Sequence, residues 1–293
     1  MSYHVLHVLQ PLCTLGKERG FLTCKSENGT TRRMPHEDVR AVIVAARGVT
    51  LTSSFLSAIM ETDGIVLHCN EAFQPCGVTS PLTRVTDTTA FLRQASRPRK
   101  LNERLWEGIL RGKTLNQLSV LKSRELDCLQ LRLALERNHI DEGNCAKRYW
   151  QLYFPSIGWL GTSRDRRNNT PPNQMLNYGY AVLSALCHRS LLIHGLSPLL
   201  GVKHTTRYRS HPLVYDLMEP FRPLVDQMLA EFLLEADVNM PAWCRKVGET
   251  LRIRRVHHQK FTLKMLDAVD ASAASMARSY RENSVEPFWV PEL

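Results

Sequence analysis

The stretch GVKHTTRYRSHPLVYDLMEPFRPLVD, residues 201–226, sets a histidine a few residues ahead of a strongly apolar segment. Apolar residues recur there at helical spacing, which predicts a helix over residues 212–236. These apolar residues are Leu213, Val214, Leu217, Phe221, Leu224 and Val225, and they occupy most of the circumference of such a helix. A helix that is apolar nearly all round packs inside a protein, so the segment predicts a buried helix.

Charged residues also lie on this helix. They follow one another at steps of three or four and are Asp216, Glu219, Arg222 and Asp226. Such spacing brings all four side chains to one face of a regular helix. On an exposed helix this pattern is a solvated face with ion pairs, and that interpretation stays open. On a buried helix, carboxylates are costly unless they are paired or bind a cation, which favours a functional site.

A histidine and a second acidic segment complete a candidate metal site. His204 precedes the buried helix, and Glu142 follows Asp141 at the expected start of another helix, residues 142–154. Each has an ordinary alternative, because a lone histidine is commonly hydrogen-bonded and an acidic residue interacts favourably with a helix N-terminus. Together with Glu219 they form an oxygen-rich set suited to Mn²⁺ or Mg²⁺. Zinc is disfavoured, since catalytic zinc sites usually add a second nitrogen or sulfur ligand.

The composition is that of a folded protein with excess positive charge. The chain has 293 residues, 43% hydrophobic and 23% charged, which is enough for one large domain or two. Its 38 lysines and arginines against 28 acidic residues give a formal net charge of +10. A polyanion is the first partner to consider, because neutralising phosphates releases condensed counterions. Charge alone leaves the partner open.

The cysteines and the apolar segments indicate a cytoplasmic protein. The 8 cysteines form no CxxC pair and no zinc-finger spacing, so we expect free thiols in a reducing cytosol. The first residues are interrupted by His4, His7 and Pro11 and do not form a secretory signal. The longest apolar region, residues 179–202, contains charged and histidine side chains, so no membrane span is expected.

The periodicity of the chain changes near residue 87. Residues 1–84 hold short apolar or alternating runs and one expected helix near residues 51–60, which predicts a small β-rich domain. Residues 85–100 are interpreted as a linker with an exposed hinge at 96–100. Residues 101–285 have helical periodicity throughout. Expected helices there cover residues 142–154, 173–194, 212–236 and 261–280. The predicted fold class is α+β, with an all-helical C-terminal domain. The last residues, 286–293, form a tail that is disordered or docks on a partner.

Several motifs resemble the CRISPR-associated integrase family, whose members insert new spacers into CRISPR arrays with a small partner protein. In the helical region they are GLSPLLGVKH, LVYDLMEPFRPLVD, EGNCAKRYW, NQMLNYGYAVLSALC and KTLNQLSVL. In the N-terminal region they are GFLTCKS, RMPHEDVRAVIVAARGVTLTSSFLSAI and GIVLHCNEAFQPCG. The resemblance covers nearly the whole chain. In length the chain is similar to the compact forms found beside single-protein RNA-guided effector nucleases.

The resemblance implies a site and a reaction. Glu142, His204 and Glu219 match the catalytic metal ligands, with Mg²⁺ or Mn²⁺ as the cofactor. Asp216 matches a further acidic position that either supports the site from behind or faces DNA. The implied reaction is attack of the 3′-hydroxyl of a captured DNA fragment on a phosphodiester at the edge of the CRISPR repeat. With water as the nucleophile, the same centre would be an endonuclease.

The resemblance also implies partners. The N-terminal domain would form homodimers, and two of these would flank a dimer of the small second adaptation protein in a heterohexamer. Double-stranded DNA would be the substrate, in a prokaryotic cytoplasm. Candidate DNA-contact residues are Arg164, Arg166 and Arg167 in an expected basic loop at 161–173, and Arg252, Arg254, Arg255 and Lys260 near the C-terminus. Simple solvated charge is an equal alternative for each of them.

Two other functions stay open at this stage. One is a metal-dependent nuclease that resolves branched DNA or repairs DNA by hydrolysis, which would give no strand-transfer products. The other is a non-catalytic DNA-binding scaffold, for which Glu219→Ala would leave every activity intact.

Overall fold

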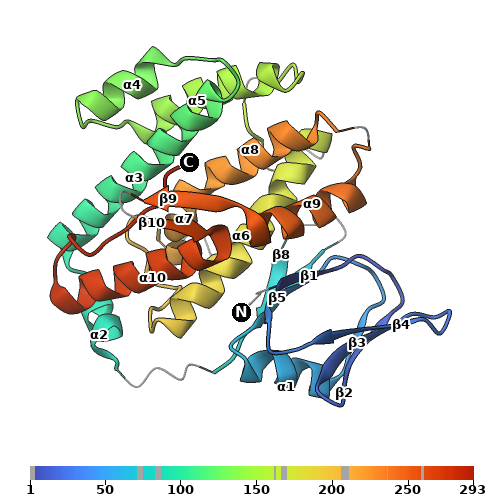
Figure 1. The fold of residues 1–293 in the computed structure, drawn as a ribbon. Coiled ribbons are helices and arrows are strands. Elements are labelled where there is room, and N and C mark those ends of the chain that lie inside the picture. Colours follow the sequence, from blue (N-terminus) through green and yellow to red (C-terminus); the bar gives the residue numbers. More distant parts are fainter. Residues whose placement is uncertain are drawn as a thin grey trace.

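The computed structural model describes residues 4–70, 75–82, 87–161, 163–165, 170–205, 211–235, 237–258 and 261–293. Figure 1 shows a strand-rich N-terminal part beside a larger helical part, which confirms the predicted α+β class. No helix among these residues is both long enough and apolar enough to cross a membrane. All 8 cysteines are free thiols, as expected.

The strand-rich part contains two four-stranded sheets. The first has the order β1-β5-β7-β8 and consists of β1 (His4–Val8), β5 (Val39–Val44), β7 (Ile65–Cys69) and β8 (Pro75–Thr79). Its first three strands are parallel, and β8 is antiparallel to β7. The second has the order β4-β3-β2-β6 and consists of β2 (Thr14–Glu18), β3 (Phe21–Lys25), β4 (Thr31–Pro35) and β6 (Thr50–Leu51). The expected helix is α1 (Ser53–Glu61), which begins after Thr52, whose side chain accepts from the Phe55 N–H.

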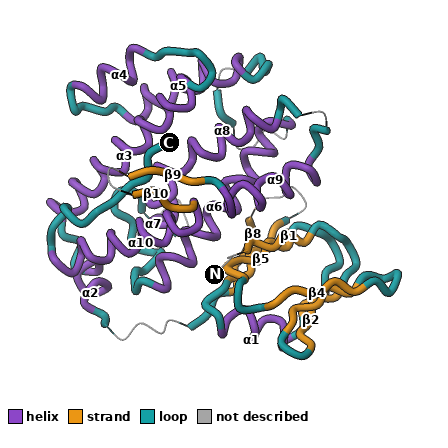
Figure 2. The backbone as a smooth tube through the Cα atoms, viewed as in Figure 1, coloured by secondary structure: helices purple, strands orange, loops and turns teal. Residues whose placement is uncertain are grey.

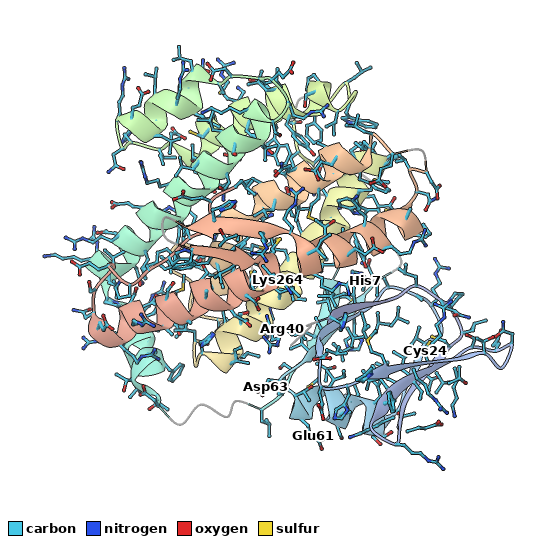
Figure 3. All side chains as sticks on the ribbon, in the orientation of Figure 1. His7, Cys24, Arg40, Glu61, Asp63 and Lys264 are labelled. Carbon is cyan, nitrogen blue, oxygen red and sulfur yellow. The ribbon has the colours of Figure 1, made fainter. Side chains whose placement is uncertain are left out.

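The first sheet is covered on both faces, and its central strand β5 is therefore buried throughout and apolar except for Arg40. Ala41 and Ile43 point into the core of the helical part, whereas Val42 and Val44 point into a smaller core with α1. Arg40, labelled at this boundary in Figure 3, forms ion pairs with side chains of the last long helix. The strand-rich part is thus fixed directly against the helices.

The helical part is built from long helices and one small hairpin. Its helices are α2 (Thr89–Ala95), α3 (Arg99–Lys122), α4 (Leu129–Glu136), α5 (Glu142–Ser156), α6 (Pro171–Ile193), α7 (Pro212–Met218), α8 (Arg222–Phe232), α9 (Met240–Ile253) and α10 (Met265–Glu282). The hairpin consists of β9 (Arg255–His258) and β10 (Phe261–Lys264), and Figure 2 shows it among the helices. Residues 261–264, expected to begin the last helix, are therefore a strand.

The helix expected over residues 212–236 is interrupted. A single 3₁₀ turn, η1 (Glu219–Phe221), separates α7 from α8. Pro220 and Pro223 lack the N–H groups that a continuous α-helix needs, and short 3₁₀ segments are common where that ladder fails. The interruption places Glu219 in a tight turn rather than in a regular α-helix.

Two segments, the expected linker and the C-terminal tail, differ from expectation. Within the expected linker, residues 89–95 form α2, and Gln94 hydrogen-bonds the carbonyl groups of Ser197 and Leu200. The expectation that the C-terminal tail is disordered or docks on a partner is wrong. Trp289 is buried, its carbonyl accepts from Ser272 Oγ at 2.6 Å, and the segment packs against α3 and α10. The apolar side chains of the tail provide their own driving force for this docking.

Candidate metal centre

A loop and the start of a helix position the histidine of the site. Asp216, on α7, is fully buried and accepts from the backbone N–H groups of Val202 at 2.6 Å and Lys203 at 3.1 Å. It also pairs with Nδ1 of His204 at 2.5 Å. Gly201 makes this close approach possible, because a Cβ there would lie 2.3 Å from the His204 carbonyl oxygen and 2.9 Å from Asp216 Oδ2.

The imidazole of His204 is held on two sides. Asp216 occupies Nδ1, and the ring of Trp106, on α3, meets it edge-on with centroids 5.7 Å apart. A metal-binding histidine characteristically uses its second ring nitrogen to hold a carboxylate, which fixes the tautomer and the orientation. The geometry therefore leaves Nε2 as the ring nitrogen that could bind a metal.

Glu219 lies in the 3₁₀ turn and is only 4% exposed. Its carboxylate is 3.0 Å from Nε of Arg222 and 2.8 Å from Nζ of Lys113, which lies on α3. Burial alone would raise the pKa of Glu219, but Arg222 and Lys113 outweigh burial and hold that pKa at about 2. Glu219 is therefore ionised at every physiological pH.

Glu142 is the first residue of α5 and is half-buried. The N-cap is its neighbour Asp141, whose side chain accepts from the Asn144 N–H at 3.0 Å. The Glu142 carboxylate instead turns toward the site, and Lys113 Nζ lies 2.9 Å from its Oε1. Capping thus belongs to Asp141, and Glu142 is available to the site.

Two carboxylates from separate elements, α5 and η1, meet at one lysine of α3. Nζ of Lys113 contacts both Glu142 and Glu219, so the two carboxylates are close enough to share one positive group. Across the ranges that the structure describes, no three His, Cys, Asp or Glu side chains are grouped tightly enough to hold a metal ion. The donor set still fits Mg²⁺ or Mn²⁺, since it offers two ionisable carboxylates and an oriented imidazole.

Asp226, the fourth charged residue of the predicted face, hydrogen-bonds tyrosines on two other helices. Its carboxylate accepts from Tyr149 at 2.8 Å and from Tyr180, and it is fully buried. Arg222 links the two groups, because its guanidinium lies over the Tyr180 ring while Nε faces Glu219.

Comparison with known proteins identifies the family. The family described as "CRISPR associated protein Cas1" matches residues 6–261. This chain belongs to the Cas1 family. A Cas1 endonuclease of Neisseria meningitidis serogroup C (strain 8013) is 29% identical over 276 residues, 91% of this chain and 89% of that protein. A second Cas1 endonuclease, from Pyrobaculum aerophilum, is 26% identical over 237 residues, 75% of this chain and 79% of that protein.

Solved structures share the Cas1 fold with this chain. A Cas1 protein from Thermotoga maritima superposes with a TM-score of 0.78 at 17% identity, covering 94% of this chain and 96% of the other. A casposase bound to its integration product gives a TM-score of 0.80 at 17% identity, covering 99% and 94%. At this identity the likeness establishes the fold.

The basic residues proposed to contact DNA fall into three groups in this Cas1 chain. Arg252 and Arg255 are exposed. Arg254 points back to Glu231, which it contacts at 2.6 and 2.7 Å, and Arg164 bonds Asn173 at 2.6 Å. Arg166, Arg167 and Lys260 lie outside the described residues.

Sequence reasoning missed two residues that build the site. Lys113 lies in the KTLNQLSVL motif, but its partners are 29 and 106 positions away along the chain. Trp106 lies among the buried residues of α3, and nothing in its spacing marks it as part of a site. A basic residue amid buried positions of α3 was the one available signal for Lys113, since a buried lysine requires a partner.

Proposed function

We propose that this Cas1 protein is a metal-dependent DNA integrase that inserts new spacer DNA into a CRISPR array. The observation that carries the proposal is the single cation position shared by Glu142 and Glu219 beside an oriented His204. Family membership supports it, as do the names of the relatives from Neisseria meningitidis and Pyrobaculum aerophilum, which are CRISPR-associated endonucleases.

Each side chain of the site would have its own role in phosphoryl transfer. Glu142, Glu219 and Nε2 of His204 would hold Mg²⁺ or Mn²⁺, while Asp216 keeps the imidazole oriented. A bound cation there would neutralise phosphate charge and lower the pKa of the attacking hydroxyl. The 3′-oxygen of the fragment forms a bond to phosphorus while the repeat-edge P–O bond breaks, which leaves a 3′-hydroxyl on the repeat strand. One phosphodiester replaces another, so no external energy source is needed.

The partners proposed are double-stranded DNA, a second copy of this chain and the small second adaptation protein in a heterohexamer. The fold likeness to a chain of a Cas6-RT-Cas1–Cas2 complex, with a TM-score of 0.75, supports an assembly of this kind. The net charge of +10 and the exposed Arg252 and Arg255 favour a DNA surface. The match to the Neisseria relative covers 91% of this chain and 89% of that protein, which supports the proposal that this chain is a compact form of the family.

A second candidate function uses the same residues with water as the nucleophile. The product would then be hydrolysed DNA, as for a branched-DNA or repair nuclease. The endonuclease names of the relatives favour this candidate as an additional activity.

A strand-transfer assay tests the proposal. The purified protein, its small partner and Mn²⁺ or Mg²⁺ are mixed with a labelled fragment and a supercoiled plasmid carrying a repeat. We expect joined products that require metal and that disappear in His204→Ala and Glu219→Gln, with the exposed Glu249→Gln as the matched control. Hydrolysis without joining would support the nuclease instead. If both site variants keep full activity, these residues are not catalytic, and the non-catalytic DNA-binding scaffold becomes the favoured function.

A further inference from the structure

The ammonium of Lys113 lies between the carboxylates of two of the proposed metal ligands. Its Nζ is 2.9 Å from Glu142 Oε1 and 2.8 Å from Glu219 Oε2, and the side chain is only 12% exposed. Both partners are ligands in the proposed metal centre. In the described structure these are the two ion pairs that bring α5 and the η1 turn to the same point on α3.

The backbone of α3 keeps Lys113 at this position. The preceding residue, Gly112, is so close to its neighbours that a Cβ there would lie 2.9 Å from Val290 and 3.4 Å from Pro220. Asn116, one turn later on α3, donates to the Pro220 carbonyl at 2.8 Å. Since Pro220 follows Glu219 directly, the distance between α3 and the carboxylate is fixed by packing. Lys113 can move only through its flexible side chain.

Two cations cannot share this space without strong repulsion. Two like charges about 4 Å apart repel each other strongly at a site shielded from water, and a divalent ion doubles that repulsion. The carboxylates need a cation in either state, because a second negative charge beside the buried Glu219 is costly. An exchange of one cation for the other satisfies both requirements.

We propose that Lys113 is the built-in counter-cation of the metal centre, and that a divalent ion bound by Glu142 and Glu219 displaces its ammonium. Lys113 is thus a positioning residue that holds the carboxylates together before metal binds and competes with the metal for them. The inference rests on the proposed metal-dependent function. A lysine that merely braced α5 would stay in place, and its loss would weaken metal binding by letting the carboxylates separate.

Metal affinity distinguishes these two roles directly. Mn²⁺ binding to the full-length protein is measured by isothermal titration calorimetry, and the melting temperature is recorded with and without Mn²⁺. The variants are Lys113→Met, which removes the charge, and Lys113→Arg, which keeps it. The matched control is Lys147→Met, an exposed lysine on α5.

We expect Lys113→Met to bind Mn²⁺ roughly tenfold or more tightly than the wild type, because the competing charge is gone. Its melting temperature without metal should fall, and saturating Mn²⁺ should raise it by more than in the wild type. Lys113→Arg should bind Mn²⁺ no more tightly than the wild type, and Lys147→Met should match the wild type. If Lys113→Met does not fold without metal, Lys113→Gln replaces it with the same expected gain in affinity.

The inference is overturned if the charge-removing variants bind Mn²⁺ as weakly as the wild type or more weakly. It is also overturned if Lys113→Arg gains affinity as they do. In either case a wild type that still binds Mn²⁺ and transfers strands leaves the proposed function standing. A wild type whose Mn²⁺ binding is unaffected by Glu219→Gln would overturn the proposed metal centre, and the inference with it.

Discussion

Asp216 is fully buried and contacts His204 from the side away from the proposed metal. Its two oxygens accept from Nδ1 of His204 and from backbone N–H groups of Val202 and Lys203. A carboxylate behind a histidine ligand typically contributes a factor of roughly 10 to 100 in metal affinity. The loop and the imidazole are therefore held by the same buried group.

The first prediction concerns this carboxylate. Asp216→Asn removes one acceptor oxygen, so we expect Mn²⁺ affinity to fall by roughly 10- to 100-fold while the protein remains folded. Calorimetric titration measures the affinity, and circular dichroism checks the fold. Asp141→Asn is the control, since asparagine also serves as an N-cap. Equal affinity in Asp216→Asn and the wild type would show that His204 needs no orienting group.

The second prediction concerns pH. Burial raises the pKa of Asp226 to about 6, although hydrogen bonds from Tyr180 and Tyr149 oppose that rise. The folded state therefore binds the proton more tightly than the unfolded state, so this contribution to stability is present at low pH and is lost as pH rises through about 6. We expect a loss of about 1.4 kcal/mol in unfolding free energy between about pH 5 and about pH 7.5, from this residue alone.

Denaturant unfolding of the wild type and Asp226→Asn at both pH values measures this contribution. The difference between the two proteins isolates Asp226 from His7 and His188, whose burial lowers their pKa values to about 4 and gives the opposite dependence. An identical pH dependence in the two proteins would mean that Asp226 is ionised throughout this range.

At the scale of elements, the C-terminal segment supports the turn that carries Glu219. Asn116 on α3 donates to the carbonyl groups of Pro220 at 2.8 Å and Pro291 at 2.9 Å, and accepts from the Leu293 N–H at 3.0 Å. One buried side chain thus connects the helix, the 3₁₀ turn and the tail.

The third prediction follows from this connection. Asn116→Ala leaves buried carbonyl groups without donors, so we expect a loss of about 1–3 kcal/mol in unfolding free energy and a weaker Mn²⁺ site. Denaturant titration and calorimetry measure the two effects, with the exposed Glu107→Ala on the same helix as control. If Asn116→Ala lowers stability but leaves Mn²⁺ affinity unchanged, the contacts of the tail do not influence the metal site.

The sequence predicted elements well where one periodicity extends over a whole segment. The apolar run AVIVAA corresponds to β5, and the helices near residues 142 and 173 begin within two residues of expectation. The interrupted helix was not predicted because the apolar spacing continues unbroken across Pro220 and Pro223 and carries no sign of the 3₁₀ turn. The hairpin at 255–264 was missed because its short strands depend on pairing with each other and on the tail bridge at Glu292.

The site was predictable only in part, for a similar reason. The types and spacings of His204, Glu219 and Glu142 indicate a metal centre, and the resemblance selects those three. The partner of the two carboxylates lies on α3, and sequence spacing carries no information about which face of that helix meets them. Arg164 shows the same limit, since an apparent loop arginine bonds Asn173 and Asn177 on α6.

At the scale of the whole molecule, buried ion pairs join the strand-rich part to the helical part. Arg40, 7% exposed, contacts Asp267 at 3.2 Å and Asp270 at 3.0 Å, and Arg189 reaches Asp270 from α6. A core that continues from the first sheet into the helices surrounds them. The two parts are thus expected to unfold together.

The fourth prediction tests this joint. Arg40→Met removes a buried cation that contacts two partly exposed carboxylates of α10, so we expect the unfolding free energy to fall by about 1–3 kcal/mol. We expect a single unfolding transition in the wild type. Differential scanning calorimetry measures both. Arg33→Met, on the exposed strand β4, is the control. Two separate transitions in the wild type would show that the parts unfold independently.

The measurement that tests the central claim most directly is anomalous X-ray scattering from crystals containing Mn²⁺. The account predicts one strong peak among the carboxylates of Glu142 and Glu219 and Nε2 of His204, with the Lys113 ammonium moved away from them. It also predicts that Glu219→Gln abolishes the peak. Mn²⁺ bound elsewhere, with Lys113 still between the two carboxylates, would contradict the metal centre on which the proposed integrase function depends.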